Sequence, residues 1–294
     1  MPSFAARRAG LLFGSFTAEA LSLGVHWIYD PALLAAQYGR VTNYVAPAPG
    51  SYHPKKKAGD QGHVGDQALC LLQFLLREKH WDPAAFRKDW VAMWDGYPDY
   101  FDKATKGTLA RLAEGNDSGS ASDELAGPAR IAPLAAFLSE ADEATLVAAA
   151  LEQTALTHHS SSAAETAEFL ARSAHRLLHG APLDETLRML APGWAWNAAA
   201  KVLSLDAVEA LGHLGRACPI PAALPAVIYL ARRHGEDLET AFIENAIAGG
   251  DNCARGLALG LLLGAAHGVD AIPKRWRQEL RAAPILESFL AAKS

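Results

Sequence analysis

The chain has 294 residues, of which 50% are hydrophobic and 20% are charged, and its formal net charge at pH 7 is −5. This length and composition allow a large packed core and are typical of a soluble globular protein. The negative net charge argues against broad binding to nucleic acid, because nucleic-acid-binding proteins usually carry a basic patch. The longest apolar run, residues 257–266, is too short and too rich in glycine to span a membrane.

The cysteines and the first residues indicate the cellular compartment. The three cysteines show no C-x-x-C spacing and lie mostly among apolar residues, which is typical of a reduced, intracellular protein. Residues 1–14 carry two arginines but lack the apolar segment and cleavage site of a signal peptide. We therefore expect a cytoplasmic protein.

Apolar residues recur with helical spacing along most of the chain, and no segment alternates apolar and polar residues as a half-buried strand does. We expect helices at residues 5–24, 31–38, from 66 onward, 83–97, 100–114, from 127, 143–156, 161–179, 183–190, 196–204, 207–214, 221–234, 237–248, from 251, and 273–292. Their connections are short, and no linker or internal repeat divides the chain. The sequence predicts a single all-α domain over residues 1–294.

Two of these helices carry small residues at every fourth position. The stripes are Gly10, Gly14 and Ala18 in one helix, and Gly256, Gly260 and Gly264 in the other. Each glycine inside a helix costs about 1 kcal/mol relative to alanine, so three on one face indicate an unusually close contact. We expect the two stripes to pack against each other and to bring Glu19 close to the second helix.

Residues 26–62 form an irregular, proline-containing stretch before the third helix. A loop of this length in a compact protein is usually functional or mobile. The run Lys55-Lys56-Lys57 within it favours a solvated turn. His53, inside the loop, and His63, just after it, are candidates for substrate binding and for acid–base chemistry near neutral pH.

Asp66 and Asp251 each stand at the start of an expected helix, and Asp251 follows two glycines. Taken singly, either carboxylate is explained by capping of free N–H groups and by the helix dipole. A shared binding site is the competing interpretation.

A polar, glycine-containing loop covers residues 114–123. It presents Ser118, Ser120, Ser122 and Asp123 before a new helix, which suits binding of a phosphate or of sugar hydroxyls. A plain capping loop would have the same composition. No nucleophile elbow, phosphate-binding loop or dinucleotide fingerprint is present.

Five motifs, in order, resemble the ADP-ribosylglycohydrolase family. They are GLLFGSFTAEALSLG, GDQGHVGDQALCLLQFL, ARIAPL, ALTHHSSSAAETAEFLA and GGDNCARGLALGLLLGAAHGVDAIPKRW, and together they cover residues 10–276. The stretches WIYD, YHPKKKAGDQGHVGDQ and SASDELAGPARIAPL are most similar to the branch related to jellyfish J-type crystallins. The resemblance implies an orthogonal helical bundle that cleaves ADP-ribose from a partner with the help of two magnesium ions.

The family's metal-binding motifs are incomplete in this chain. Its Thr-Asp-Asp motif aligns with residues 64–66, where only Asp66 is an acid, and its Gly-Gly-Asp-x-Asp-Thr motif aligns with residues 249–254, where only Asp251 is kept. Glu19 stands where many members have an aspartate. Cys253, in place of an aspartate, is a soft ligand that suits magnesium poorly. Because two adjacent dications need several negative ligands, we expect a single magnesium ion at Asp66 and Asp251, with Glu19 or Asp60 as a further ligand, or no ion. His53 and His63 are candidates to substitute for the lost ligands.

Arg255 is one turn into the helix that follows Asp251. We expect its guanidinium to neutralise Asp66 and Asp251 through a bidentate ion pair and so to replace the metal charge. The resemblance also places His158 and Asn252 in the substrate pocket. Since adjacent histidines cannot both face inward, His158 and His159 should contribute one side chain at most.

Two functions fit these residues. The first is a hydrolase of an ADP-ribose-like or other glycosidic substrate, either a small molecule or an ADP-ribosylated partner. Asp66, Asp251 and Glu19 would be its catalytic carboxylates, and a histidine would carry the proton. The second is a non-catalytic, crystallin-like protein that binds a ligand or serves a structural role on the same fold. The retained polar residues favour a remodelled pocket, whereas the lost ligands argue against the family's usual metal chemistry.

Overall fold

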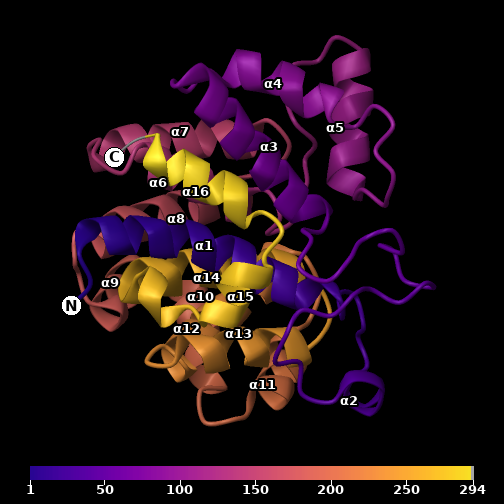
Figure 1. Cartoon of the computed structure of the whole chain (residues 1–294), viewed down its shortest axis with the longest axis vertical. Helices are drawn as coiled ribbons and strands as arrows, with labels where there is room; N and C mark the ends of the chain where they lie inside the picture. Colours follow the sequence, from indigo (N-terminus) through magenta and orange to yellow (C-terminus); the bar gives the residue numbers. More distant parts are fainter. Residues whose placement is uncertain (293–294) are drawn as a thin grey trace.

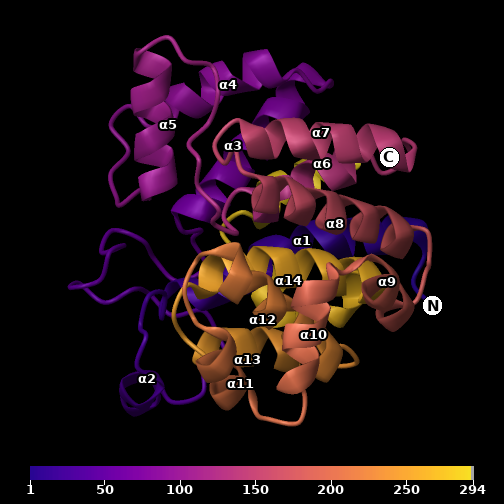
Figure 2. The ribbon, with the colours of Figure 1, turned by 180° about the vertical axis from the view of Figure 1, so that it is seen from behind.

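The computed structural model describes residues 1–292, and every regular element in that range is a helix (Figures 1 and 2). The α-helices are α1 (Phe4–Leu23), α2 (Pro31–Tyr38), α3 (His63–Glu78), α4 (Pro83–Ala92), α5 (Lys103–Ala113), α6 (Ala132–Phe137), α7 (Glu143–Ala155), α8 (Ser161–Leu178), α9 (Leu183–Leu190), α10 (Gly193–Lys201), α11 (Ala207–Leu214), α12 (Ile220–Arg233), α13 (Leu238–Ile247), α14 (Asn252–His267), α15 (Lys274–Glu279) and α16 (Ala283–Ala291). Two short 3-10 helices are η1 (Pro128–Ile131) and η2 (Val269–Ala271). The all-α prediction is confirmed, and within the described range no helix is long and apolar enough to cross a membrane.

Helices α1 and α14 form the centre of the molecule. In both views they run together across the middle, with α10 to α13 on one side and α3, α6, α7 and α8 on the other (Figures 1 and 2). From Gly256 to Ala265 every residue of α14 is buried, as is nearly all of α1. These two helices therefore carry the core on which the other helices pack.

The glycine stripes of α1 and α14 face each other across a backbone contact, as predicted. A Cβ atom built on Gly260 would lie 2.1 Å from the carbonyl oxygen of Gly14, and one built on Gly264 would lie 2.0 Å from that of Gly10. The Ser15 hydroxyl donates a hydrogen bond across the same contact, to the carbonyl of Leu257 at 2.9 Å. Only glycine fits at these positions, because any larger residue would overlap with main-chain atoms.

The long connection between α1 and α3 is anchored to the C-terminal helices. The Tyr44 hydroxyl donates to the carbonyl of Trp276 at 3.0 Å, and the Trp276 indole donates to the carbonyl of Thr42 at 2.9 Å. The backbone N–H of Arg281 donates to the carbonyl of Gly59 at 3.0 Å. These bonds hold an otherwise irregular segment in one place.

Some predicted boundaries are wrong for local reasons. Helix α3 begins at His63 after an extended Gly62, so Asp66 is in its first turn and does not cap it. The single helix predicted at 273–292 is two helices, because Pro284 in the first turn of α16 cannot continue a preceding helix. The helix predicted from 100 starts at Lys103, where Asp102 caps it by accepting from the N–H of Thr105 at 2.6 Å.

The glycine contact predicts a large stability difference between two Gly→Ala substitutions. Gly260→Ala should lower the free energy of unfolding by about 1–3 kcal/mol, because the new methyl group forces the two backbones apart. Gly212→Ala in α11 is the matched control: its Cβ would meet only the Arg216 guanidinium, 3.5 Å away. That control should be neutral or stabilise by up to about 1 kcal/mol through helix propensity. Urea denaturation of both variants checks this, and equal effects would refute the close contact.

Candidate functional site

A cavity of about 330 Å³ opens where the start of α3, the start of α14 and the loops before α2 and α5 meet. This volume lies in the range of small-ligand pockets. Its aromatic lining residues are Trp27, Tyr29, Tyr52 and Tyr100, and its charged or titratable ones are His63, Asp102, Lys103, Glu124, Cys218 and Asp251. The cavity thus combines flat rings for stacking with several acid groups.

Trp27 is the centre of the aromatic wall. Its ring lies edge-on to Tyr52 and Tyr100, at centroid distances of 4.8 and 4.9 Å. Its φ of 63° is in the left-handed region that side chains other than glycine rarely adopt. A backbone hydrogen bond of 2.9 Å to the carbonyl of Gly250 holds this strained conformation. Strained residues of this kind cluster at binding sites, so Trp27 becomes a candidate site residue that the sequence interpretation did not single out.

Asp251 stands immediately before α14 and lines the cavity. Its side chain makes no capping hydrogen bond, so the capping interpretation is wrong for this residue. Oδ2 accepts from the Trp27 indole at 3.1 Å, whereas Oδ1 is buried and has no hydrogen-bond partner within the described range. Burial raises the pKa of Asp251, and the Trp27 hydrogen bond and the nearby His63 and Arg255 act against that rise.

Arg255 is fully buried but forms no ion pair with Asp66 or Asp251, in contrast to our expectation. Its guanidinium donates to the carbonyl oxygen of Gly249 at 2.6 Å and to the side chain of Asn245 at 3.2 Å. The N–H groups of Arg255 that we expected to bind the two carboxylates instead donate to backbone carbonyls of the turn and its neighbour. Arg255 therefore fixes the glycine turn before α14. It acts on Asp251 only through its charge, which reduces the rise in the pKa of that carboxyl group.

His63 and Asp102 form a buried pair at the cavity wall. His63 Nε2 lies 3.2 Å from Asp102 Oδ2. Burial lowers the pKa of His63, but the contact with Asp102 and the charges of Asp251 and Glu19 together raise this pKa above its ordinary value. The same partner holds the pKa of Asp102 below its usual range, although burial alone would raise it. The sequence interpretation found His63 and missed Asp102, which carries no motif beyond its helix-capping position.

Glu124 is a second acid that the sequence interpretation missed. It follows the predicted polar loop directly, and the backbone N–H of Leu125 donates to the carbonyl of Cys218 at 3.0 Å. Its side chain accepts from the Cys218 thiol at 3.2 Å. Burial, followed by the charges of Asp102 and Asp251, raises the pKa of Glu124. A protonated Glu124 beside a carboxylate is a combination suited to acid–base catalysis.

The four predicted loop residues support this segment and do not line the cavity. Ser120 donates to the carbonyl of Thr157 at 2.9 Å, and the hydroxyl of Ser118 accepts from Arg111 at 2.6 Å. The hydroxyl of Ser122 accepts from the N–H of Glu124, and Asp123 is exposed to solvent. Their hydrogen bonds are internal, so the loop positions Glu124.

Asp66 and Glu19 lie close together beneath the loop that precedes α3. Lys56 pairs with Asp66, and the Tyr97 hydroxyl donates to the same carboxylate at 2.5 Å. Lys56 is thus a structural partner and not part of a solvated turn as predicted. Glu19 is fully buried, and its Oε1 accepts from the N–H of Gly62 at 2.8 Å.

These donors do not match a centre of two magnesium ions. The Lys56 ammonium occupies the position beside Asp66 that a cation would take. Cys253 is buried against the backbone of Glu19, at 3.7 Å from its carbonyl, and burial raises the pKa of its thiol. Hard oxygen ligands are therefore too few here for two dications.

The remaining predicted residues have mixed positions. His158 is buried and His159 is exposed, and neither lines the cavity beside Asp251. Both line a neighbouring cavity of about 410 Å³, and His158 Nε2 lies 4.0 Å from Glu124. Asn252 is buried, and its Oδ1 lies 3.0 Å from Nδ1 of His26.

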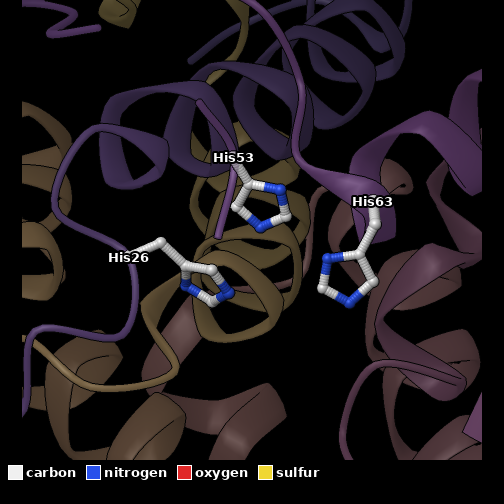
Figure 3. A group of neighbouring side chains, drawn as sticks. All are labelled: His26, His53 and His63. Carbon is white, nitrogen blue, oxygen red and sulfur yellow. The ribbon is translucent and has the colours of Figure 1, made fainter. Parts of the chain in front are cut away.

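His26, His53 and His63 form a buried cluster that the sequence pattern did not reveal as a group (Figure 3). One nitrogen of each ring lies within 4.8 Å of the corresponding nitrogens of the other two. Burial lowers the pKa of His26 to about 3 and that of His53 to about 2. The three residues come from separate segments with no common spacing. Only the fold brings them together.

The structure is that of an all-α protein with an acid-lined cavity. The sequence profile of the family described as ADP-ribosylglycohydrolase matches residues 1–293, so the chain belongs to that family. A solved structure described as an "ADP-ribosylglycohydrolase-related protein complex" has the same fold, with a TM-score of 0.78 and 23% identity over 99% of this chain and 98% of that chain. No curated protein matches by sequence.

Glu19 predicts an unusual pH dependence of stability. Burial, and then the charge of Asp66, raise the pKa of Glu19 from its ordinary value of 4.5 to about 8. Between these values the folded chain holds a proton that the unfolded chain releases, so stability falls as pH rises through this window. Glu19→Gln keeps the acceptor for Gly62 and should flatten that loss.

Urea denaturation at about pH 5, 6.5 and 8, across this window, measures the effect. Glu287→Gln, at an exposed position, should follow the wild type. A Glu19→Gln variant with the same pH profile as the wild type would contradict the raised pKa.

Proposed function

We propose that this protein hydrolyses a glycosidic bond of an ADP-ribose-like substrate in the cavity beside Asp251. The observation that carries the proposal is the state of Asp251: a buried carboxylate at the pocket wall, fixed at one oxygen by Trp27 and unpartnered at the other. A fixed carboxylate with one free oxygen is arranged to orient and deprotonate a water molecule.

Hydrolysis of a glycosidic bond also requires a proton donor for the leaving group. Glu124 lines the same cavity, and burial and neighbouring acids raise its pKa, which keeps it protonated at higher pH than a free glutamate. We assign Asp251 as the base and Glu124 as the acid. Asp66 and Glu19, the other expected acids, are assigned to holding the loop before α3, because they bind Lys56 and Gly62 of that loop. No step is assigned to magnesium.

The lining of the cavity supports a nucleotide-like substrate. Trp27, Tyr52 and Tyr100 offer aromatic surfaces on which a base or a sugar ring can stack. Lys103 also lines the cavity, and its ammonium suits a phosphate group. The cavity volume of about 330 Å³ fits part of such a molecule, with the remainder or the modified partner outside.

A non-catalytic, crystallin-like role on the same fold is the competing outcome, and the specific link to the J-type crystallin branch stays a prediction. Both the hydrolase and the crystallin-like protein would keep the glycine contact between α1 and α14. The two roles make different demands on Asp251 and Glu124, because a structural protein has no need of two acids with raised pKa values in one cavity. The test therefore rests on those two residues.

The experiment measures release of ADP-ribose from peptides ADP-ribosylated on arginine or serine. We expect turnover by the wild type, and a loss of about 100-fold or more in kcat for Asp251→Asn and for Glu124→Gln, the range for removing an acid or base. Asp270→Asn, at an exposed position in η2, should retain full activity. Calorimetric binding of ADP-ribose to the wild type without turnover would favour the non-catalytic role, and neither binding nor turnover would refute the proposal.

A further inference from the structure

We propose that His26, His53 and His63 form a binding site for one divalent transition-metal ion of the zinc class. This site is separate from the Asp66 and Asp251 positions that align with the family's metal motifs. The proposal goes beyond the hydrolase function and does not depend on it, since metal binding can be measured without substrate.

The first argument is convergence in space. One nitrogen of each imidazole lies within 4.8 Å of the other two, and all three side chains are buried (Figure 3). Figure 3 shows each ring turning a nitrogen toward the space among them. Ions bound to imidazole nitrogen at about 2.0–2.1 Å in tetrahedral geometry require those nitrogens to be roughly 3.4 Å apart. Small side-chain rotations that move each ring nitrogen by about 1 Å would bring the three nitrogens to that separation.

The second argument concerns the other nitrogen of each ring, the one that would not bind the ion. An oxygen acceptor lies near each of these nitrogens. His26 Nδ1 lies 3.0 Å from the side-chain oxygen of Asn252, and His63 Nε2 lies 3.2 Å from Asp102. His53 Nδ1 faces the buried carboxylate of Asp99 at 3.8 Å. In metal sites the ligating histidine donates its other N–H to such an acceptor, which fixes the tautomer and aims the lone pair. His26 and His63 have such an acceptor within 3.2 Å, whereas the carboxylate beside His53 lies farther away and makes no hydrogen bond with it.

The third argument is the state of the nitrogens that remain. His26 Nε2, His63 Nδ1 and both nitrogens of His53 are buried without a hydrogen-bond partner in the part of the chain that the structure describes. A buried polar atom left unpaired costs about 1–3 kcal/mol. One ion bound by three lone pairs would remove that cost at three rings together.

The chemistry of the donors selects the ion. Neutral imidazole suits zinc, cobalt, nickel and copper, whereas magnesium requires oxygen ligands. The nearby Asp99 and Asp102 carboxylates offset the charge of a dication in this buried place. Three histidines leave a fourth position for water or another ligand, which is the pattern of zinc sites that remain open. His63 also lines the substrate cavity and so connects the two sites.

A purely structural cluster is the competing interpretation, because Trp27 stacks on His26 at a centroid distance of 4.3 Å and lies near the other two rings. A stacked cluster would bind no ion. The experiment therefore begins with the full-length wild type, stripped with a chelator and titrated with Zn²⁺ by calorimetry and with Co²⁺ by visible absorption. We expect one ion per chain, an intense tetrahedral Co²⁺ spectrum, and no competition from excess Mg²⁺.

Substitutions then locate the ion. His53→Ala and His26→Ala should weaken Zn²⁺ binding by 100-fold or more, and Asp102→Asn by about 10- to 100-fold through loss of its support of His63. His179→Ala is the matched control, because this exposed histidine of another histidine pair should leave the affinity unchanged. Far-UV circular dichroism checks folding, and His53→Gln replaces His53→Ala if the latter does not fold.

Two results would overturn the proposal. One is a folded wild type that binds neither Zn²⁺ nor Co²⁺ at a ratio near one per chain. The other is binding that persists undiminished in folded His26 and His53 variants, which would place the ion elsewhere. Retained zinc binding in Asp251→Asn and Glu124→Gln, whatever their hydrolase activity, keeps the test independent of the proposed function.

Discussion

The direct contact between the backbones of α1 and α14 is the constraint on which the other features depend. At Gly10 and Gly264, and again at Gly14 and Gly260, there is no room for a single methyl group. This contact joins the first α-helix to one near the C-terminal end of the chain, and it places the start of α14 beside the connection that leaves α1. Asp251 and Trp27 meet there through one hydrogen bond. A shift of either helix would separate them, so the close packing also sets the geometry of the pocket.

Burial changes the pKa values of the acids in the cavity, and the direction of each change depends on the neighbouring groups. At Glu124 and Asp251 burial outweighs the neighbouring groups that favour the charged form, and the pKa values of both residues rise. Asp102 is equally enclosed, but the adjacent His63 holds its pKa low. The pocket therefore contains carboxyl groups of different proton affinity within one small volume. This division of roles is what acid–base catalysis requires, and it arises from placement and not from residue type.

The glycine spacing and the family motifs were sufficient to predict an all-α fold, the helix pair at its centre and the position of Asp251. Sequence could not predict Trp27 or Asp102, because their roles come from contacts with residues far along the chain. The bidentate role predicted for Arg255 was wrong, since periodicity does not show that backbone carbonyls of the preceding turn lie within reach. The histidine cluster was missed for the same reason: His26, His53 and His63 share no spacing, and an irregular loop joins them.

The anchoring of the loop by Trp276 has a consequence for the order of events during synthesis. Thr42 and Trp276 are separated by 234 residues, so this anchor of the loop can form only after almost the whole chain has emerged from the ribosome. Helices such as α7 and α8 are neighbours in sequence and can pair early, whereas contacts of such high sequence separation form late. The pocket is therefore completed last, and a nascent chain that stalls before residue 276 would hold most of its helices without a binding site.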